Sequence, residues 1–247
     1  MKIGLLICDH LDPDVAEHIH GDYDTRLFPE LLAPLDATIV SYEAVAGQLP
    51  QSPDECDAWT TTGSRHNSTD DDPWILALGA FLVDIVDSGR PLVAVCFGHQ
   101  LLARMLGGRV ATAEVGWGVG VKDFEVVNRP DWMGDGVDRF QVLMSHKDQV
   151  LEPPPGAVVI GSAPYCPVGA YTLGTNVLAV QGHPEFVPEL SETLIKRRVA
   201  LIGEQASQAG LDSLTADWSD ATVRSWVVRF LSSAGRQDGA SHMTPTA

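Results

Sequence analysis

The stretch that decides the fold is PLVAVCFGHQLLARMLGG, residues 91–108. Five apolar or small residues precede Cys96, and the apolar spacing that follows predicts a helix beginning at Phe97. A buried strand that ends on a nucleophile and turns sharply into a helix is a nucleophile elbow. The elbow would place the sulfur of Cys96 at the carboxyl end of a sheet, where the N–H groups and the dipole of the helix stabilise a thiolate.

Gly98 supports an elbow, because a residue without a Cβ atom fits where the backbone turns tightly. A second interpretation is open from this stretch alone. Free cysteines are commonly buried in protein cores, so Cys96 would also suit a core strand with no chemical role. A catalytic cysteine needs partner residues, and those partners decide between the two interpretations.

The segment NVLAVQGHPEF, residues 176–186, offers such partners. Its apolar residues predict a short buried strand over 177–180, and a polar loop follows. His183 and Glu185 are two residues apart, so their side chains lie on the same side of an extended segment, and Pro184 stiffens the link between them. Since a cysteine nucleophile requires a base and a group that orients the base, the segment predicts both.

Taken together, the two segments resemble the class I (triad) glutamine amidotransferases, and among them the stand-alone branch similar to the amidotransferase domain of GMP synthetase. The resemblance extends over residues 1–190. The matching motifs are VCFGHQ (95–100), QGHPEF (181–186) and the weaker TTGSRHNSTDDDPWI (61–75), GWGVG (116–120) and MSHKDQV (144–150). The same branch includes plant γ-glutamyl peptidases, whose elbow and His-Pro-Glu segments are similar to these.

The resemblance assigns roles to residues by position. The three catalytic residues would be the nucleophile Cys96, the base His183 and the orienting acid Glu185. Backbone N–H groups near Gly63 and at Phe97 would form the oxyanion hole. One position departs from the family pattern, because Ala94 stands two residues before the nucleophile, where the family usually has glycine. Alanine is still small, so we expect a tight elbow.

Four further residues are candidates for substrate binding: Gln100, Ser145, His146 and Trp117. The resemblance implies that Gln100 helps to hold the glutamyl head group. It also implies that the loop with Ser145 and His146 meets the α-amino and α-carboxylate groups, largely through the backbone. Trp117 lies between two glycines and would suit a pocket wall. For Gln100 and Trp117, simple packing in the core is the alternative.

Strands and helices alternate along the chain, which predicts an α/β fold with a mostly parallel open sheet flanked by helices. Short alternating runs between residues 110 and 160 predict an additional, smaller mixed-sheet layer. Apolar spacing predicts a long helix over 188–208 and a further helix over 215–231. Ligands of open sheets bind outside the carboxyl ends of the strands, where the predicted nucleophile and base lie.

We expect three regions along the chain. A glutamine amidotransferase-like catalytic domain would cover residues 1–187, and a C-terminal helical extension packed on it would cover 188–232. A helical surface for a partner or for self-association is the alternative role for the extension. Residues 233–247 are small and polar and predict a disordered tail.

The composition narrows the possible function classes. The chain has 247 residues, 16 of them basic and 33 acidic, and a net charge of −17. Such a charge repels phosphate backbones and argues against binding to nucleic acid. The sequence contains no run of the roughly twenty apolar residues that span a bilayer, and its N-terminus does not resemble a secretory signal. We therefore expect a cytoplasmic protein without membrane association.

Neither a metal nor an organic cofactor is expected. The four cysteines, Cys8, Cys56, Cys96 and Cys166, are scattered and form no C-x-x-C pair that would indicate a zinc site or a disulfide framework. His18 and His20 invite a metal interpretation, but the sequence places no third ligand near them.

The resemblance implies a hydrolase that cleaves the γ-glutamyl amide of glutamine through a γ-glutamyl thioester on Cys96, releasing glutamate and ammonia. The sequence has no GxxxxGK[ST] nucleotide-binding motif, so the ammonia would pass to a synthetase partner. The alternative is a stand-alone γ-glutamyl peptidase that acts on γ-glutamyl conjugates. A second alternative is a catalytically idle regulatory module on the same fold. The oligomeric state stays open.

Overall fold

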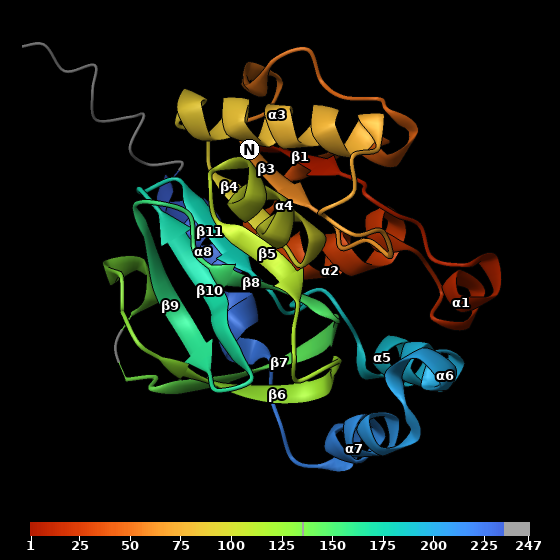
Figure 1. The fold of residues 1–247 in the computed structure, drawn as a ribbon. Helices are drawn as coiled ribbons and strands as arrows, with labels where there is room; N and C mark the ends of the chain where they lie inside the picture. Colours follow the sequence, from red (N-terminus) through yellow and green to blue (C-terminus); the bar gives the residue numbers. More distant parts are fainter. Residues whose placement is uncertain (135, 235–247) are drawn as a thin grey trace, which may run out of the picture.

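A nine-stranded sheet forms the centre of the protein (Figure 1). The computed structural model describes residues 1–134 and 136–234. The strands follow the order β2-β1-β3-β4-β11-β10-β9-β6-β7. The first five are mutually parallel: β2 (Thr38–Tyr42), β1 (Lys2–Leu6), β3 (Ala58–Thr61), β4 (Leu92–Val95) and β11 (Val177–Val180). The predicted α/β fold with a large, mostly parallel sheet is confirmed.

Apolar sequence explains why β4 and β11 occupy the middle of the sheet. Their sequences are LVAV and VLAV, and every residue of both strands is buried. Strands that are covered by helices on both faces need such continuous apolar runs. The two strands pair in parallel, with Val95 opposite Val180. The segments that follow them, from Cys96 and from Gln181, therefore start side by side.

The antiparallel half of the sheet begins at β11. β10 (Cys166–Leu173) precedes β11 through a tight connection, and two strands joined so closely pair antiparallel. The next strands are also antiparallel to their neighbours: β9 (Ala157–Ala163), β6 (Gly118–Val126) and β7 (Arg139–His146). Most of the runs that we expected in a separate mixed layer thus extend the main sheet. The smaller layer of the described residues is the antiparallel pair β5 (Arg109–Thr112) and β8 (Asp148–Glu152).

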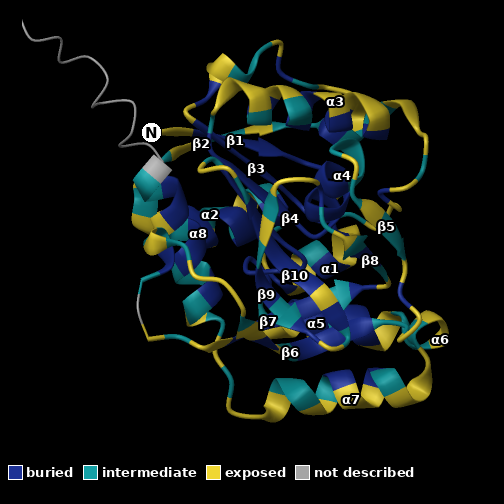
Figure 2. Ribbon diagram, turned by 60° about the vertical axis from the view of Figure 1, so that its left-hand side comes forward, coloured by how far each residue is buried: buried dark blue, intermediate teal, exposed yellow. Residues whose placement is uncertain are grey.

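Helices cover both faces of the sheet (Figures 1 and 2). One face carries α3 (Pro73–Ser88) and α4 (Phe97–Met105), and the other carries α2 (Phe28–Leu32) and α8 (Ala221–Ala234). Each pair of helices shares a separate apolar core with its side of the strands. In Figure 2 the central strands β1, β3, β4 and β11 are almost entirely buried.

Short helical segments connect the larger elements of the described chain before the C-terminal region. They are α1 (Pro13–His18), a π-helical turn (Tyr23–Leu27) and four 3₁₀ turns (Ala33–Leu35, Ala44–Ala46, Pro53–Glu55 and Asp131–Met133). None of the helices in the described part of the chain combines the length and the apolar character needed to cross a bilayer.

The C-terminal region differs from the single long helix that we expected over 188–208. It consists of α5 (Pro188–Arg197), α6 (Val199–Ile202) and α7 (Glu204–Thr215). The last break falls at Gly203, whose φ of 91° and ψ of 147° a helix cannot adopt. The three helices lie together at one end of the sheet (Figure 1). The second predicted helix begins later than expected, as α8, and of the predicted disordered tail only its first two residues are described, where they end α8.

Gly98 in the first turn of α4 allows this helix to lie directly against β3. A Cβ atom at position 98 would lie 2.0 Å from Oγ1 and 2.8 Å from Cβ of Thr61. Thr61 is not free to turn away, because its Oγ1 accepts a hydrogen bond of 3.0 Å from the backbone N–H of Val95. The glycine is therefore required for packing next to the elbow.

Replacing Gly98 with alanine should destabilise the protein. The added methyl group forces helix and strand apart, and overpacking of a core costs about 1–3 kcal/mol. Chemical denaturation of both proteins would measure the difference in the free energy of unfolding. An unchanged value would mean that α4 can shift without loss of packing.

Candidate active site

Cys96 occupies the turn between β4 and α4, as predicted. Its backbone has φ 47° and ψ −95°, a conformation that residues other than glycine rarely adopt. Strain of this kind costs about 1–3 kcal/mol and is typical of functional sites. Ala94, the departure from the family pattern, is completely buried in β4 and pairs with Ala179 of β11. The tight elbow thus forms with alanine at this position.

His183 and Glu185 lie in the loop that follows β11. Nδ1 of His183 is 2.8 Å from Oε1 of Glu185, and both side chains are buried. The ring of Phe186 stacks on the imidazole with a centroid distance of 3.9 Å. The backbone N–H of His183 donates to the carbonyl of Leu143 at 2.8 Å. Two contacts thus orient the imidazole, and the third holds the backbone of the same residue.

The charges around His183 favour its protonated form. Burial alone would lower the pKa of His183, but the charges on Cys96 and Glu185 outweigh it and raise the pKa from 6.5 to about 10. Nε2 of His183 is buried, and apart from the Cys96 sulfur, which contributes to this raised pKa, it has no hydrogen-bond partner among the described residues. At neutral pH the ring is therefore an imidazolium with one N–H that is available to a reacting group.

The two predicted oxyanion-hole residues adjoin the nucleophile and the base. A Cβ atom at Gly63 would lie 2.7 Å from Cε1 of His183 and 3.8 Å from Cβ of Cys96, so Gly63 lies beside both residues. Phe97 is the first residue of α4, and the N–H of a first helical residue has no acceptor within the helix. These two backbone positions are suited to bind a negative oxygen formed at Cys96.

A pocket of about 480 Å³ opens beside Cys96. This volume lies in the range of pockets that bind small molecules. All four predicted substrate-binding residues line the pocket together with Cys96: Gln100, Trp117, Ser145 and His146. The structure therefore brings the sequence-predicted residues to one place.

The amide of Gln100 is already fully engaged inside the protein. Its Nε2 donates to the carbonyl of Asp148 at 2.7 Å and to Oε1 of Gln181 at 3.1 Å. Its Oε1 accepts a hydrogen bond from the hydroxyl of Ser68 at 3.2 Å. These contacts give Gln100 a structural part in the pocket wall, in addition to any contact with a substrate.

Two histidines near the site are neutral. Burial, with a contribution from the charges of His183, His99 and Lys122, lowers the pKa of His146 to about 3. Burial also lowers the pKa of His99 to about 3, and its ring packs on Tyr171 at a centroid distance of 5.0 Å. Neither can replace His183 as an acid, because neither is protonated at neutral pH.

Gln181, which the sequence analysis did not single out, contacts the nucleophile directly. Its Nε2 donates to Sγ of Cys96 at 3.6 Å, and its Oε1 accepts from Gln100. A chain of hydrogen bonds therefore runs from Ser68 through both glutamines to the sulfur. The available signal in the sequence was a polar residue directly after the apolar run VLAV.

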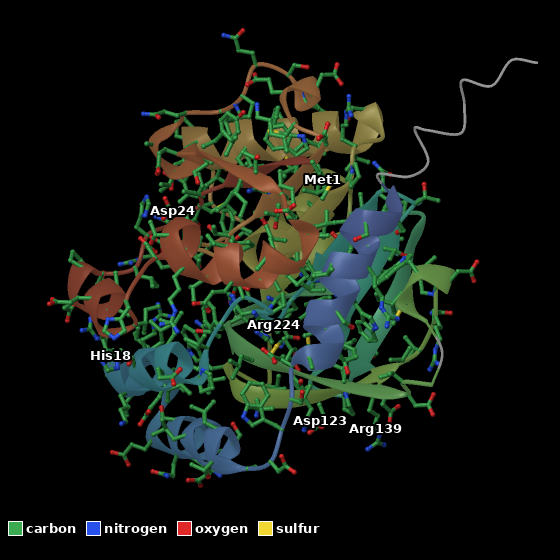
Figure 3. All side chains as sticks on the ribbon, turned by 180° about the vertical axis from the view of Figure 1, so that it is seen from behind. Met1, His18, Asp24, Asp123, Arg139 and Arg224 are labelled. Atoms are coloured by element: carbon green, nitrogen blue, oxygen red, sulfur yellow. The ribbon has the colours of Figure 1, made fainter. Side chains whose placement is uncertain are left out.

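The C-terminal helices also contribute to the site. The guanidinium of Arg224, in the first turn of α8, donates to the carbonyl of Pro184 at 2.7 Å and so holds the loop between the base and its acid (Figure 3). Leu194 of α5, Leu201 of α6 and Arg198 between them line the pocket. Amphipathic spacing predicted these helices but did not reveal these contacts.

The described residues contain no group of three or more His, Cys, Asp or Glu side chains that could hold a metal ion. All four cysteines are free and buried. Burial raises the pKa of both Cys8 and Cys166 to about 12, so these two thiols stay protonated at neutral pH.

Comparisons with known proteins found a matching family model and several related proteins. Residues 80–201 match the family model of glutamine amidotransferase class-I. The chain is 28% identical over 232 residues to gamma-glutamyl peptidase 4 of Arabidopsis thaliana, which covers 91% of this chain and 92% of that protein. It is 40% identical over 101 residues to the glutamine-hydrolyzing GMP synthase of Aeropyrum pernix, which covers 41% of this chain and 20% of that protein.

Solved structures show the same fold. A glutamine amidotransferase from Methylobacillus flagellatus has a TM-score of 0.74 at 19% identity and covers 99% of both chains. A glutamine amidotransferase from Thermotoga maritima also has a TM-score of 0.74, at 16% identity, and covers 93% of this chain and 97% of its own. Fold and matched region together define an α/β protein of the amidotransferase type. Residues 80–201 form a class I glutamine amidotransferase domain.

Replacing Gln181 with leucine should slow the reaction of Cys96 with iodoacetamide at pH 7 by about 10–100-fold. The substitution removes an N–H donor from the sulfur, and a hydrogen bond to a charged group contributes about 1.5–3 kcal/mol. Labelling followed by mass spectrometry gives the rate at Cys96 separately from the other thiols.

Gln141→Leu, which removes an amide that pairs with Asp123 on the edge of the sheet, serves as the matched control. Gln181→Glu keeps the shape but places a carboxylate beside the sulfur, and it should slow the labelling at least as much. If Gln181→Leu reacts like the wild type, the hydrogen bond does not stabilise the thiolate.

Proposed function

We propose that the protein is a cysteine hydrolase that cleaves γ-glutamyl amide bonds with Cys96, His183 and Glu185. The observation that carries this proposal is the position of a strained cysteine next to a buried His–Glu pair, at the edge of a pocket of small-molecule size. The family supports the reaction type, because its members act on the amide of glutamine, and the related plant proteins are named γ-glutamyl peptidases.

The first half of the reaction forms an acyl-enzyme. The thiolate of Cys96 attacks the γ-carbonyl carbon, and the C=O electrons move onto oxygen, where the N–H groups at Gly63 and Phe97 would hold the charge. One such donor can be worth about 10²–10³ in rate. The C–N bond then breaks, and the leaving nitrogen takes the proton from Nε2 of His183. The products are a free amine and a γ-glutamyl thioester on Cys96.

The second half of the reaction releases glutamate. His183, now neutral, removes a proton from a water molecule, and the resulting hydroxide attacks the thioester carbonyl. The C–S bond breaks, and the electron pair returns to sulfur as the thiolate. Glu185 keeps the imidazole in the required tautomer and stabilises its charged form throughout. The residues complete this cycle through acid–base and nucleophilic steps.

The breadth of the match favours a self-sufficient γ-glutamyl hydrolase over an ammonia donor. The similarity to γ-glutamyl peptidase 4 covers nearly the whole of both chains, whereas the similarity to GMP synthase covers a fifth of that protein. A glutaminase that passes ammonia to a synthetase partner is the second candidate, because the same three residues serve it. A complete Cys–His–Glu set argues against a catalytically idle module.

Cys96→Ala should abolish turnover and leave the fold intact. The triad acts as a unit, and loss of its nucleophile costs a factor of about 10⁴ or more in kcat. The measurement is glutamate release from glutamine and from a γ-glutamyl dipeptide, with circular dichroism as the check on folding. Activity that survives in the folded variant contradicts the proposed nucleophile.

Glu185→Gln should lower kcat by about 10²–10⁴, with a smaller effect on KM, because the imidazole loses its orienting charge. The pH profile should change as well. Glu185 helps to raise the pKa of His183 to about 10, so in the wild type the proton donor is present at neutral pH and is lost as the pH rises through 10. Without that carboxylate, the alkaline limb of kcat/KM should move to lower pH. A limb that stays in place would mean that another group titrates.

A further inference from the structure

Arg198 occupies a distinctive position between α5 and α6. It lines the pocket that contains Cys96, and it also lines a small adjoining hollow that contains His183. Asp12, Ser64, Arg65, Ser145 and Leu194 are likewise shared by both hollows. Arg198 therefore lies at the junction between the nucleophile side and the base side of the site.

The guanidinium of Arg198 lacks a carboxylate partner. Its recorded contact is a long hydrogen bond of 3.4 Å from Nη1 to the hydroxyl of Ser145, and none of the described carboxylates forms an ion pair with it. Its neighbours differ in this respect. Arg65 pairs with Asp9 and Asp12, and Arg197 pairs with Asp14.

This unpaired cation is notable in a chain of net charge −17. The pocket beside Cys96 is lined by four basic residues, Arg65, Lys147, Arg197 and Arg198, and by two acidic residues, Asp12 and Asp148. Because Arg65 and Arg197 are paired with aspartates, Arg198 and Lys147 supply the positive charge of this pocket that no described carboxylate pairs, and such charge attracts anionic ligands. A half-buried guanidinium that lacks an anion inside the protein is suited to bind one from a ligand, because its planar fork matches a carboxylate.

The position of His183 identifies which part of a substrate meets Arg198. In the proposed reaction the leaving nitrogen accepts its proton from Nε2 of His183, so the leaving group starts at the hollow that contains His183. This hollow measures only about 30 Å³, so the rest of an amino acid leaving group extends into the adjoining pocket of about 480 Å³. Arg198 lines both spaces. Ammonia carries no further group that could reach a guanidinium, whereas an amino acid or peptide leaving group carries its own carboxylate.

We propose that Arg198 binds the carboxylate of the leaving group and thereby selects γ-glutamyl peptides with a free C-terminus. This inference rests on the proposed γ-glutamyl hydrolase function and adds the residue that distinguishes one leaving group from another. Lys147, which is exposed at the same pocket and has no ion-pair partner among the described residues, adds to the positive potential there.

The experiment compares three substrates: a γ-glutamyl dipeptide with a free carboxylate, the same dipeptide with a C-terminal amide, and glutamine. The kcat and KM values are measured for the wild type, Arg198→Gln and Arg198→Lys. Arg139→Gln is the control for charge, because Arg139 is exposed and pairs with Glu125 at the outer edge of β7, away from α5 and α6 (Figure 3). The ratio between dipeptide acid and amide within each protein is then compared across proteins, which cancels their different intrinsic reactivity.

We expect Arg198→Gln to lower kcat/KM for the dipeptide acid by about 10–100-fold, chiefly through KM, because one charge-assisted hydrogen-bonded contact is lost. The values for the dipeptide amide and for glutamine should change less than about threefold. Arg198→Lys should recover part of the loss, and Arg139→Gln should behave like the wild type.

Two results would overturn the inference. An equal loss for all three substrates would place Arg198 on the glutamyl head group or in the support of the fold, and no loss for any of them would leave it without a part in binding. Failure of the proposed function looks different: none of the three substrates would then be cleaved faster by the wild type than by Cys96→Ala.

Discussion

The parallel pairing of β4 with β11 is the contact on which the site depends. Its register places Val95 opposite Val180, so the nucleophile and the loop with its base leave the sheet at the same edge. The backbone N–H of Cys96 donates to the carbonyl of Val180 at 2.8 Å and fixes this alignment at the last residue of the strand. Because side chains alternate along a strand, a slip of one residue would turn the apolar residues of β11 to the opposite faces of the sheet. The apolar runs of both strands thus serve stability and catalysis together.

Close to this contact, the buried imidazole of His183 lies between two groups whose charge is opposite to its own, Cys96 and Glu185. Burial alone would make His183 neutral, and the anionic neighbours on both sides of the ring reverse that tendency. The nearby His146 and His99 have no such neighbours and follow the tendency of burial, which lowers the pKa of each. The same kind of side chain thus becomes an acid or a neutral packing element according to the anions beside it.

The sequence was sufficient for the parts of the protein that depend on local pattern. The elbow at Cys96, the His–Glu pair and the alternation of strands and helices all follow from short-range spacing. The pairing partners of the strands between 110 and 160 did not, because alternation predicts a strand but not its neighbour. The break at Gly203 was missed because a single glycine within an apolar pattern is often tolerated. Gln181 and Arg224 were missed because their roles arise from contacts between segments that lie far apart in the chain.

The strained backbone of Cys96 sets stability against reactivity. A glycine would adopt the same φ without strain, so the fold itself would gain from a residue that has no nucleophile. A typical domain is stable by only about 5–15 kcal/mol, and strain of this kind takes up about 1–3 kcal/mol of that margin. The packing around β4 and β11 therefore has to offset the free-energy cost of the strained backbone at Cys96. A substitution of Cys96 by glycine would thus give a more stable protein that has lost its nucleophile.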